Sequence, residues 1–551
     1  MKPMNLLRVP ANAAVLLMLN GCNFAPKYDP PKTEPSPVYK EAVPGGDEAA
    51  QGWKLAEPRD AAIRNNWWEM YNDPQLDDLE ARVAISNQTI VAAEASYRAA
   101  FALVKEAQAQ LFPTLNTYPS ATRQKNTAAL AQIDGISSTG AAASAPVATS
   151  AHNIFDLPLE ATYQVDLWGS IRNTVAANRF SAESSAALLA NALLSTQTTL
   201  AQDYFQLRVA DEQRRILDKT VADYRLSLQL VRTLVESGVD SEADVASAES
   251  LLDAAMALAT DAGVARAEFE HAIAVLIGVS PAQFSIPYKR LDQQLPVIPV
   301  GVPSDLLERR PDIASAERQV AQTNAQIGVA KAAFFPSLTL SATGGYESTA
   351  VSNLFNAPNK MWSAGPSLAG YIFDGGARRA ALAQARALNE SQAATYRATV
   401  LSAFQSVEDE LAALRILSVE LGQAHQATDA AQRALDLTVV LFRTGVDSYV
   451  QLVTAEVALM SARETELGVQ LKQLTASVVL INDLGGGWDA HQLSQTERMA
   501  NHPPDAGKPA QVPAENSGAP AANPPPMPPG EVQPDQIFEK IYDIPGPKPK
   551  P

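Results

Sequence analysis

The sequence predicts a mostly α-helical protein made of two copies of one unit, with long strands set between the helices. The phrase LVESGVDSEADVASAES begins at Leu234, and LFRTGVDSYVQLVTAEV begins 207 residues later at Leu441. Each phrase is a helical pattern that Gly-Val-Asp-Ser interrupts. A third observation is the strict alternation of apolar and polar residues from Phe155 to Leu167, which is typical of a strand. We therefore expect each unit to contain a helix, two strands and a long helical hairpin.

The N-terminus has the features of a secretory signal, predicted over residues 1–21. Lys2 and Arg8 precede an apolar stretch that ends at Leu19, and about ten apolar residues are too few to span a bilayer. The following Leu-Asn-Gly-Cys resembles the bacterial lipoprotein box, which implies cleavage before Cys22 and acylation of its thiol. Asn23 stands where an aspartate signals retention in the inner membrane in many bacteria, so the resemblance points to the outer membrane. Cys22 is the only cysteine, which excludes a disulfide within the chain.

The net charge and the apolar runs of the chain limit which partners and which membrane crossings are expected, and the composition of its two ends predicts irregular terminal segments. The net charge is −17, and removing a signal that carries Lys2 and Arg8 lowers it to −19, so nucleic acid is not an expected partner. After Cys22 no apolar run reaches the length of a membrane helix, and strands must make any membrane crossing. Residues 22–65 are predicted to be an extended lead. Residues 489–551 are predicted to be a disordered tail, because 15 of the last 51 residues are proline.

The duplication extends beyond the two phrases. QVDLWGSIR and YIFDGGARR, and YFQLR and LAALR, also lie 207 residues apart. Further upstream, LFPTL from Leu111 corresponds to FFPSL from Phe334. The offset is about sixteen residues larger there, because the first copy carries a longer loop. We therefore place repeat 1 at 66–300 and repeat 2 at 301–488.

Each repeat is expected to open with an amphipathic helix. In repeat 1 this helix begins at Asp73-Pro74, a capping aspartate followed by a proline in the first turn. In repeat 2 it begins after Asp305 and ends at Pro336. The apolar seam of the first helix has steps of three and four residues, as in coiled coils: it consists of Leu76, Leu79, Val83, Ile90, Ala93, Tyr97 and Val104.

Four strands are predicted, at about 113–123, 155–167, 336–346 and 362–373. Strands with two different faces and about 9 to 11 residues are what a membrane barrel requires. Four strands cannot close a barrel, whereas three chains would supply twelve. The second strand of each repeat leads into an alanine-rich helix, Ile171 to Glu236 or Ala377 to Thr444, that spans about 100 Å. Each Gly-Val-Asp-Ser is therefore expected at the tip of a long hairpin.

A family resemblance rests on several of these segments. WWEMYNDPQLDDL, YQVDLWGSIR, the run from VPSDLLERRPDIASAERQ to FFPSLTLSATGGY, YIFDGGARRA, the tip phrases and DLGGGW together resemble the OprM-like, NodT-type branch of the TolC superfamily. Its members are outer-membrane channels of tripartite efflux pumps. The resemblance covers roughly Cys22 to Trp488. It implies a homotrimer with a 12-stranded β-barrel in the outer membrane, continued by a 12-helix periplasmic α-barrel, with a periplasmic adaptor and an inner-membrane RND transporter as partners.

We expect the hairpin tips to dock the adaptor. The two glycines allow a left-handed turn, the aspartates and serines can cap the returning helices, and the valines leave small apolar knobs. These residues would also make ordinary well-formed turns, and that alternative stays open. The residues are Gly238, Val239, Asp240 and Ser241 in the first tip and Gly445, Val446, Asp447 and Ser448 in the second.

A periplasmic gate is expected just after the second tip. The helical spacing of Val450 and Thr454 places them on one face. In close relatives within the family that this chain resembles, an aspartate usually stands where this chain has Thr454, and a basic residue usually stands where it has Val457. This chain lacks those charges, and we expect an apolar constriction at Val450. Leu452 or Val453 would support it, and Glu456 would be a solvated tunnel carboxylate. A charged gate at Glu456 or Asp244 is the alternative.

No catalytic or metal-binding constellation is apparent, and no cofactor is expected. The five histidines are scattered, the glycine pairs lack a Lys-Ser/Thr ending, and Arg309, Arg310 and Asp312 are interpreted as a charged helix start. The sequence thus predicts a passive exit duct for drugs or other small toxic compounds. A type I secretion duct for proteins and a periplasmic spacer lipoprotein without a pore are the alternatives.

Overall fold

The structure is a computed structural model that describes residues 23–32, 39–41, 66–125, 151–291, 295–298 and 306–488. The chain divides into two units, 1–500 and 501–551, and the second unit lies outside the described residues. The predicted signal, Cys22 and the predicted tail 489–551 also lie outside them.

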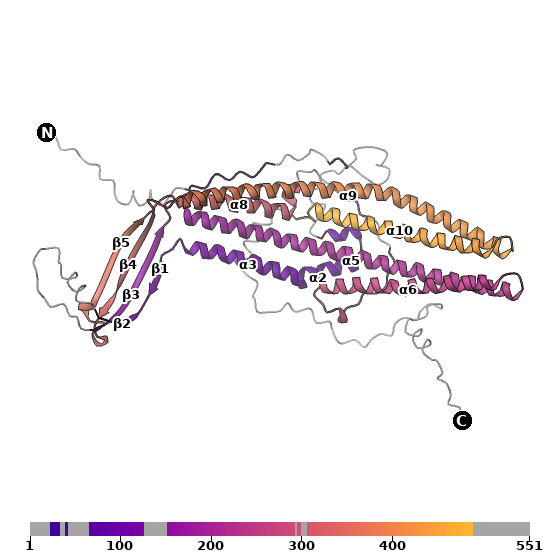
Figure 1. Cartoon of the computed structure of the whole chain (residues 1–551), viewed down its shortest axis with the longest axis horizontal. Helices are drawn as coiled ribbons and strands as arrows, with labels where there is room; N and C mark the ends of the chain where they lie inside the picture. The colour runs from indigo at the N-terminus through magenta and orange to yellow at the C-terminus, as the bar shows by residue number, and fades with distance from the viewer. Residues whose placement is uncertain are drawn as a thin grey trace, which may run out of the picture. The chain divides into compact units, whose positions relative to one another are not determined.

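Two long helical hairpins dominate the first unit (Figure 1). Helices α5 (Ser170–Glu236) and α9 (Ala377–Arg443) each have 67 residues, and α6 (Glu242–Leu276) and α10 (Tyr449–Asp483) each have 35. Both pairs begin 207 positions apart, the offset of the tip phrases. The predicted bounds of the two long helices agree with the structure to within one residue, because apolar periodicity and terminal glycines marked their ends.

The first predicted helix is divided in two, which corrects the expectation of one continuous seam. Helix α2 (Pro74–Ser86) ends before Asn87, and α3 (Gln88–Ala109) begins after it. The Asn87 side chain accepts from the backbone amides of Thr89 and Ile90 at 2.8 and 3.2 Å. It also donates to the carbonyl of Leu276 at 2.7 Å. Asn87 therefore caps α3 while it bonds to the end of α6, and a continuous helix could not do both.

The helix that opens the second half is also interrupted. Helix α7 (Leu306–Arg309) stops before α8 (Pro311–Ala332). Arg310 lies at the break and contacts Asp312 at 2.8 Å and Asp483 at 3.2 Å. The charged segment thus joins the start of α8 to the end of α10, in agreement with the structural role expected for it. Short 3-10 helices cover Trp67–Tyr71 (η2), Pro281–Gln283 (η3), Val351–Asn353 (η5) and Ala357–Asn359 (η6).

One antiparallel sheet contains all described strands. They are β1 (Thr114–Thr117), β2 (Ser120–Gln124), β3 (His152–Val165), β4 (Ser337–Ser348) and β5 (Lys360–Ala369). The order is β1-β3-β4-β5, and β2 also pairs with β3. The predicted first strand is therefore two short strands, β1 and β2, which both pair with β3. Within the described part of the chain, β1, β2 and β5 each pair on one side only.

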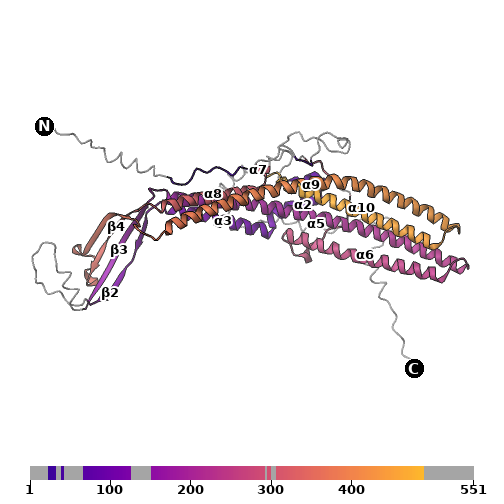
Figure 2. The ribbon, with the colours of Figure 1, turned by 45° about the horizontal axis from the view of Figure 1, so that its top comes forward.

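The sheet and the hairpin tips lie at opposite ends of the long helices (Figures 1 and 2). Helices α3 and α8 run beside the sheet-proximal parts of α5 and α9, whereas α6 and α10 run beside the distal parts. Helix α10 also contacts α5, which joins the two hairpins. Each long helix therefore changes its partners midway along its length.

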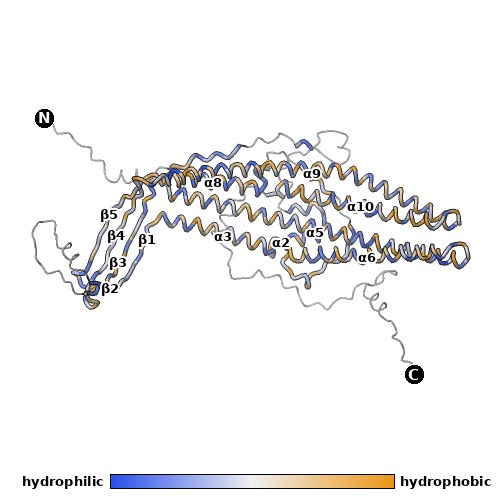
Figure 3. The backbone as a smooth tube through the Cα atoms, in the orientation of Figure 1, coloured by the Kyte–Doolittle hydropathy of each residue, from blue (hydrophilic) through white to orange (hydrophobic). Residues whose placement is uncertain are grey.

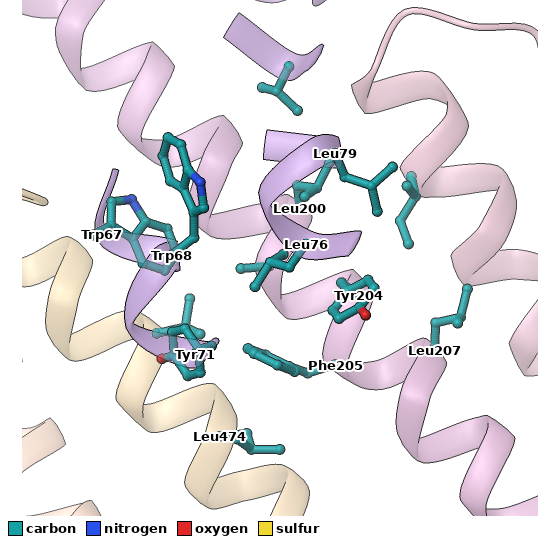
Figure 4. Close-up of a cluster of buried hydrophobic side chains, with 14 of the residues drawn as sticks. Trp67, Trp68, Tyr71, Leu76, Leu79, Leu200, Tyr204, Phe205, Leu207 and Leu474 are labelled. Carbon is teal, nitrogen blue, oxygen red and sulfur yellow. The ribbon is translucent and has the colours of Figure 1, made fainter. Parts of the chain in front are cut away.

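Among the described residues, the largest apolar cluster contains side chains of η2, α2, α5, α6 and α10, and Figure 4 shows part of it. Trp67, Trp68 and Tyr71 of η2 pack on α5 and α10. Tyr71 and Phe205 have ring centroids 4.9 Å apart, and the Tyr71 hydroxyl lies 2.7 Å from that of Ser477. The remaining labelled members are Leu76, Leu79, Leu200, Tyr204, Leu207 and Leu474.

Buried charges tie a connecting segment to this cluster. The Arg208 side chain is buried and donates to Asp211 at 2.8 Å and to the carbonyl of Pro287 at 2.9 Å. Arg266 pairs with Asp211 at 2.7 Å. Lys289 contacts Asp73, which also accepts from the Tyr204 hydroxyl at 2.6 Å. The chain after α6 is thus held by side-chain contacts instead of by a helix or a sheet.

No helix among the described residues is long and apolar enough to cross a lipid bilayer. Figure 3 shows polar and apolar residues interleaved along the long helices.

Candidate functional site: the hairpin tips

Both predicted tips close the long hairpins with the same backbone turn. Gly238 has φ +77° and Gly445 has φ +74°, the left-handed region that favours glycine. The amide of Val239 donates to the carbonyl of Leu234, and the amide of Val446 to that of Leu441, each at 2.9 Å. These bonds satisfy carbonyls at the ends of α5 and α9. A Cβ added at either glycine would meet nothing within 4 Å, so the turn needs glycine for its backbone alone.

The tips differ in how the returning helix is capped. The Ser241 hydroxyl accepts from the amide of Asp244 at 3.3 Å and donates to the Asp244 carboxylate at 2.5 Å. Ser448 occupies the same position before α10, but its side chain makes no capping hydrogen bond. The expectation that both serines cap is therefore correct for Ser241 and wrong for Ser448, whose side chain accepts no hydrogen bond from the first amides of α10. Asp240 and Asp447 directly precede Ser241 and Ser448 in the two turns.

The valines of the tips project outward. Val239 is 69% exposed and Val446 is 71% exposed. A short turn that brings two helices back side by side has no interior in which to bury a side chain. Each tip thus presents one small apolar group, with an aspartate next to it.

The predicted gate residues divide between an exposed and a buried face of α10. Val450 is 63% exposed, and Thr454 is exposed and donates from its hydroxyl to the carbonyl of Val450 at 2.7 Å. These two residues therefore share a face, as their spacing predicts. Leu452 is buried in the cluster that joins the tip-proximal parts of the hairpins, and Val453 packs against the same cluster. Both lie behind the exposed face.

Glu456 was expected to be a solvated carboxylate, and that expectation is wrong. The residue is only 6% exposed, and its Oε1 accepts from the Ser227 hydroxyl of α5 at 2.6 Å. The α10 side chains Tyr449, Leu452, Glu456 and Leu459 are all buried, at steps of three, four and three. This spacing is the signal in the sequence that identifies Glu456 as a member of the buried seam.

Sequence reasoning also missed the partners of Glu456. Ser227 and Tyr224 lie on α5, more than two hundred residues earlier in the chain. Tyr224 is buried, and its hydroxyl has no hydrogen-bond partner. A single helix pattern indicates burial but does not identify the facing helix, so only the packing of α10 on α5 brings these groups together. Asp244, the alternative charged gate residue, belongs to the cap of α6.

Among the described residues, no group of three or more His, Cys, Asp or Glu side chains is arranged to hold a metal ion.

Comparisons with known proteins agree with this architecture. The family model described as "Outer membrane efflux protein" matches residues 81–279 and 302–486. The probable efflux pump outer membrane protein TtgC of Pseudomonas putida is 29% identical over 491 residues, which cover 89% of this chain and 97% of that protein. The pyoverdine export outer membrane protein OpmQ of Pseudomonas aeruginosa is 32% identical over 448 residues, covering 81% and 92%. The solved structure of the outer-membrane channel OprN is similar with a TM-score of 0.75 and 27% identity, covering 85% of this chain and 100% of that one.

Proposed function

Since this chain belongs to the outer membrane efflux protein family of the TolC superfamily, we propose that it is the exit duct of a tripartite pump. In this proposal an inner-membrane RND transporter supplies the energy and a periplasmic adaptor connects it to the channel. The duct itself is passive. The cargo is a drug or another small toxic compound, in keeping with a relative named as an efflux pump protein.

The open sheet is the observation that supports a membrane channel made by several chains. Strands β1, β2 and β5 have one unpaired edge each within the described residues, and every residue of β5 except Met361 is exposed. Unpaired backbone groups in lipid cost several kcal/mol each, so the edges need partners. A homotrimer would join three such sheets into a 12-stranded barrel, and the long hairpins would continue it as a 12-helix periplasmic barrel.

The first test of this proposal is assembly and conduction. Native mass spectrometry in mild detergent is expected to give three chains, and the same preparation is expected to conduct ions in a planar bilayer. The mature N-terminus is expected to carry an acylated Cys22, which anchors the channel to the outer membrane. A stable monomer that forms no pore would overturn the proposal, and an N-terminus without acyl mass would remove the anchor.

The second test concerns the tips as adaptor-docking sites. Replacing Val239 and Val446 with glutamine is expected to abolish efflux while trimers still form, because the exposed apolar knobs would be lost. Val264→Gln, at an exposed valine within α6, is the matched control and is expected to preserve efflux. Normal drug resistance in the tip variant would mean that the tips are turns only.

The third test concerns the gate. We propose an apolar constriction at Val450, where desolvation opposes ion passage, with Thr454 one turn further along the same face. Val450→Ser is expected to raise the basal conductance. Thr454→Asp is expected to add sensitivity to divalent cations, because a ring of carboxylates binds them. An unchanged conductance in Val450→Ser would contradict the apolar gate.

A further inference from the structure

Glu456 places a carboxyl group inside the contact between the two hairpins. It lies on α10 of the second hairpin, and the Ser227 hydroxyl that contacts it lies on α5 of the first hairpin, at 2.6 Å. The surrounding cluster contains side chains from both hairpins, among them Leu228, Val231 and Leu452. This is the tip-proximal end of the helices, next to the proposed gate.

The carboxyl group has little to stabilise a negative charge. Its Oε1 accepts one hydrogen bond from Ser227, and its Oε2 is buried without a partner. The titratable groups that act on it or stand beside it are acidic or phenolic: Asp223 and Tyr224 on α5, and Tyr449 on α10. On α6, the negative charge of Asp244 raises the pKa of Tyr449. Helix α9 contributes the apolar Phe442 to the same cluster.

Burial and the neighbouring charge therefore favour the neutral form. Desolvation is the largest effect and raises the pKa of Glu456. The Ser227 hydroxyl lowers this pKa by a smaller amount, and the charge of Asp223, the smallest of the three effects, raises it. Ionisation in this position places an unpaired charge in an apolar contact, which is costly unless the hairpins separate and let water in.

We propose that Glu456 is a proton-dependent clasp between the hairpins, which holds them together near the tips when neutral and releases them when ionised. The proposal rests on the channel function proposed above, because the release acts on the gate beside it. The ligand of this site is a proton, and no other ligand is needed. Acidification of the periplasm would close the channel.

The direction in which pH changes the packing of the hairpins follows from proton linkage. With the hairpins apart, Glu456 is solvated and ionises near its ordinary pKa; with the hairpins together, its pKa is raised. The packed form thus binds more protons across the interval between these two values, so a falling pH favours packing and a rising pH opposes it. Each unit of difference between the two pKa values changes the equilibrium about tenfold per chain.

The channel experiment compares the wild type with Glu456→Gln, which mimics the neutral acid in size and hydrogen bonding. The wild type is expected to lose open probability by about tenfold between about pH 7.5 and about pH 5, whereas Glu456→Gln stays closed throughout. Glu464→Gln, at an exposed glutamate two turns further along α10, is the matched control and keeps the wild-type profile. Identical pH profiles for the wild type and Glu456→Gln would overturn the proposal.

A second variant separates proton control from simple contact loss. Ser227→Ala removes the one donor that stabilises the ionised form, so the midpoint of the pH profile is expected to move to higher pH. If Ser227 were only a structural contact, its loss would loosen the hairpins and open the channel at every pH. That second result would overturn the proposal.

A melting experiment tests the clasp without relying on conduction. The stabilisation by Glu456 is complete at low pH and is lost as the pH rises through the raised pKa. The melting temperature of Glu456→Gln in detergent is therefore expected to exceed that of the wild type by about 2 °C near pH 8 and to match it near pH 5. A constant difference across this range would refute the clasp. If the difference appears but no variant conducts, the clasp stands and the channel proposal fails.

Discussion

The two halves of the molecule have helices of equal length and tip turns of the same geometry, but they hold their connecting segments in different ways. Arg208 on α5 and Arg415 on α9 stand 207 residues apart, the offset between the halves. Arg208 is fully buried and binds the carbonyl of Pro287 in the segment after α6. The Arg415 side chain is 36% exposed and binds Glu41 in the N-terminal lead at 2.6 Å.

Each arginine therefore holds an extended segment against its long helix, and the segments come from different parts of the chain. In the first half, Asp211 supports Arg208 and also accepts from the amide of Lys289 at 3.3 Å. In the second half, Glu408 accepts from the amides of Lys40 and Glu41 at 2.7 and 2.9 Å. Helix length is set by local patterning, whereas these contacts depend on which segment reaches the helix, so the first feature matches between the halves and the second does not.

The largest expected difference between the halves concerns these two arginines. Arg208→Met leaves buried polar partners without their donor and is expected to lower the stability by about 3 kcal/mol. Arg415→Met breaks a partly exposed pair and is expected to cost less than about 1 kcal/mol. Urea unfolding in mild detergent, followed by circular dichroism, measures both values. Equal losses would show that the burial of Arg208 does not distinguish the two halves.

Substitutions of the two tip glycines are expected to have equal effects on stability. They therefore test whether the two tip turns are equivalent. Gly238→Ala and Gly445→Ala each force an alanine into the left-handed region, at about 1 kcal/mol, and neither new methyl group meets a neighbour. Gly263→Ala within α6 also meets no neighbour and is expected to stabilise the protein by up to about 1 kcal/mol. The unfolding midpoints of the three variants measure these changes in stability. A tip variant as stable as the wild type would refute the need for glycine.

The serines before the returning helices are expected to differ. Ser241→Ala removes a capping hydrogen bond and is expected to cost about 1 kcal/mol. Ser448→Ala removes no capping bond and is expected to change the stability by a few tenths of a kcal/mol at most. Hydrogen exchange of the first-turn amides of α6 and α10 provides the local measurement. Faster exchange in α10 of Ser448→Ala would reveal a cap that the structure lacks.

The smallest expected effect concerns His425 and the corresponding residue of the first half, Asp218. His425 lies 2.8 Å from Glu466, and this carboxylate raises the pKa of the histidine. Its stabilising contribution is present below the ordinary pKa of about 6.5 and is lost as the pH rises through the raised value. Asp218 pairs with Arg214 at 3.0 Å. Melting curves of His425→Gln are therefore expected to differ from the wild type most at acidic pH, and the difference is expected to vanish as the pH rises through the raised pKa of His425. Asp218→Asn breaks an exposed ion pair and is expected to change the melting temperature little.

Several elements could be predicted from the sequence because their causes are local. The long helices end at Glu236 and Arg443, two residues before Gly238 and Gly445, and the two tip turns follow from the glycines themselves. Three of the four strand regions were recognised by alternation. The first was placed only as an extended segment after a proline, and it proved to be two short strands, β1 and β2, that pair with successive parts of β3. The division at Asn87 was missed, although the capping bond to Thr89 is local; the bond of the same side chain to the carbonyl of Leu276 depends on the tertiary structure.

The sequence by itself determined the periodicities, the turns and the matched helices, since each depends on residues within a few turns of one another. The tertiary structure alone decided the environment of the charged groups. Glu456 is buried because α10 packs on α5 more than two hundred residues away in the chain, and Arg208 is buried because the segment around Pro287 folds back over it. Burial is a property of the facing surface, and a helical pattern does not identify that surface.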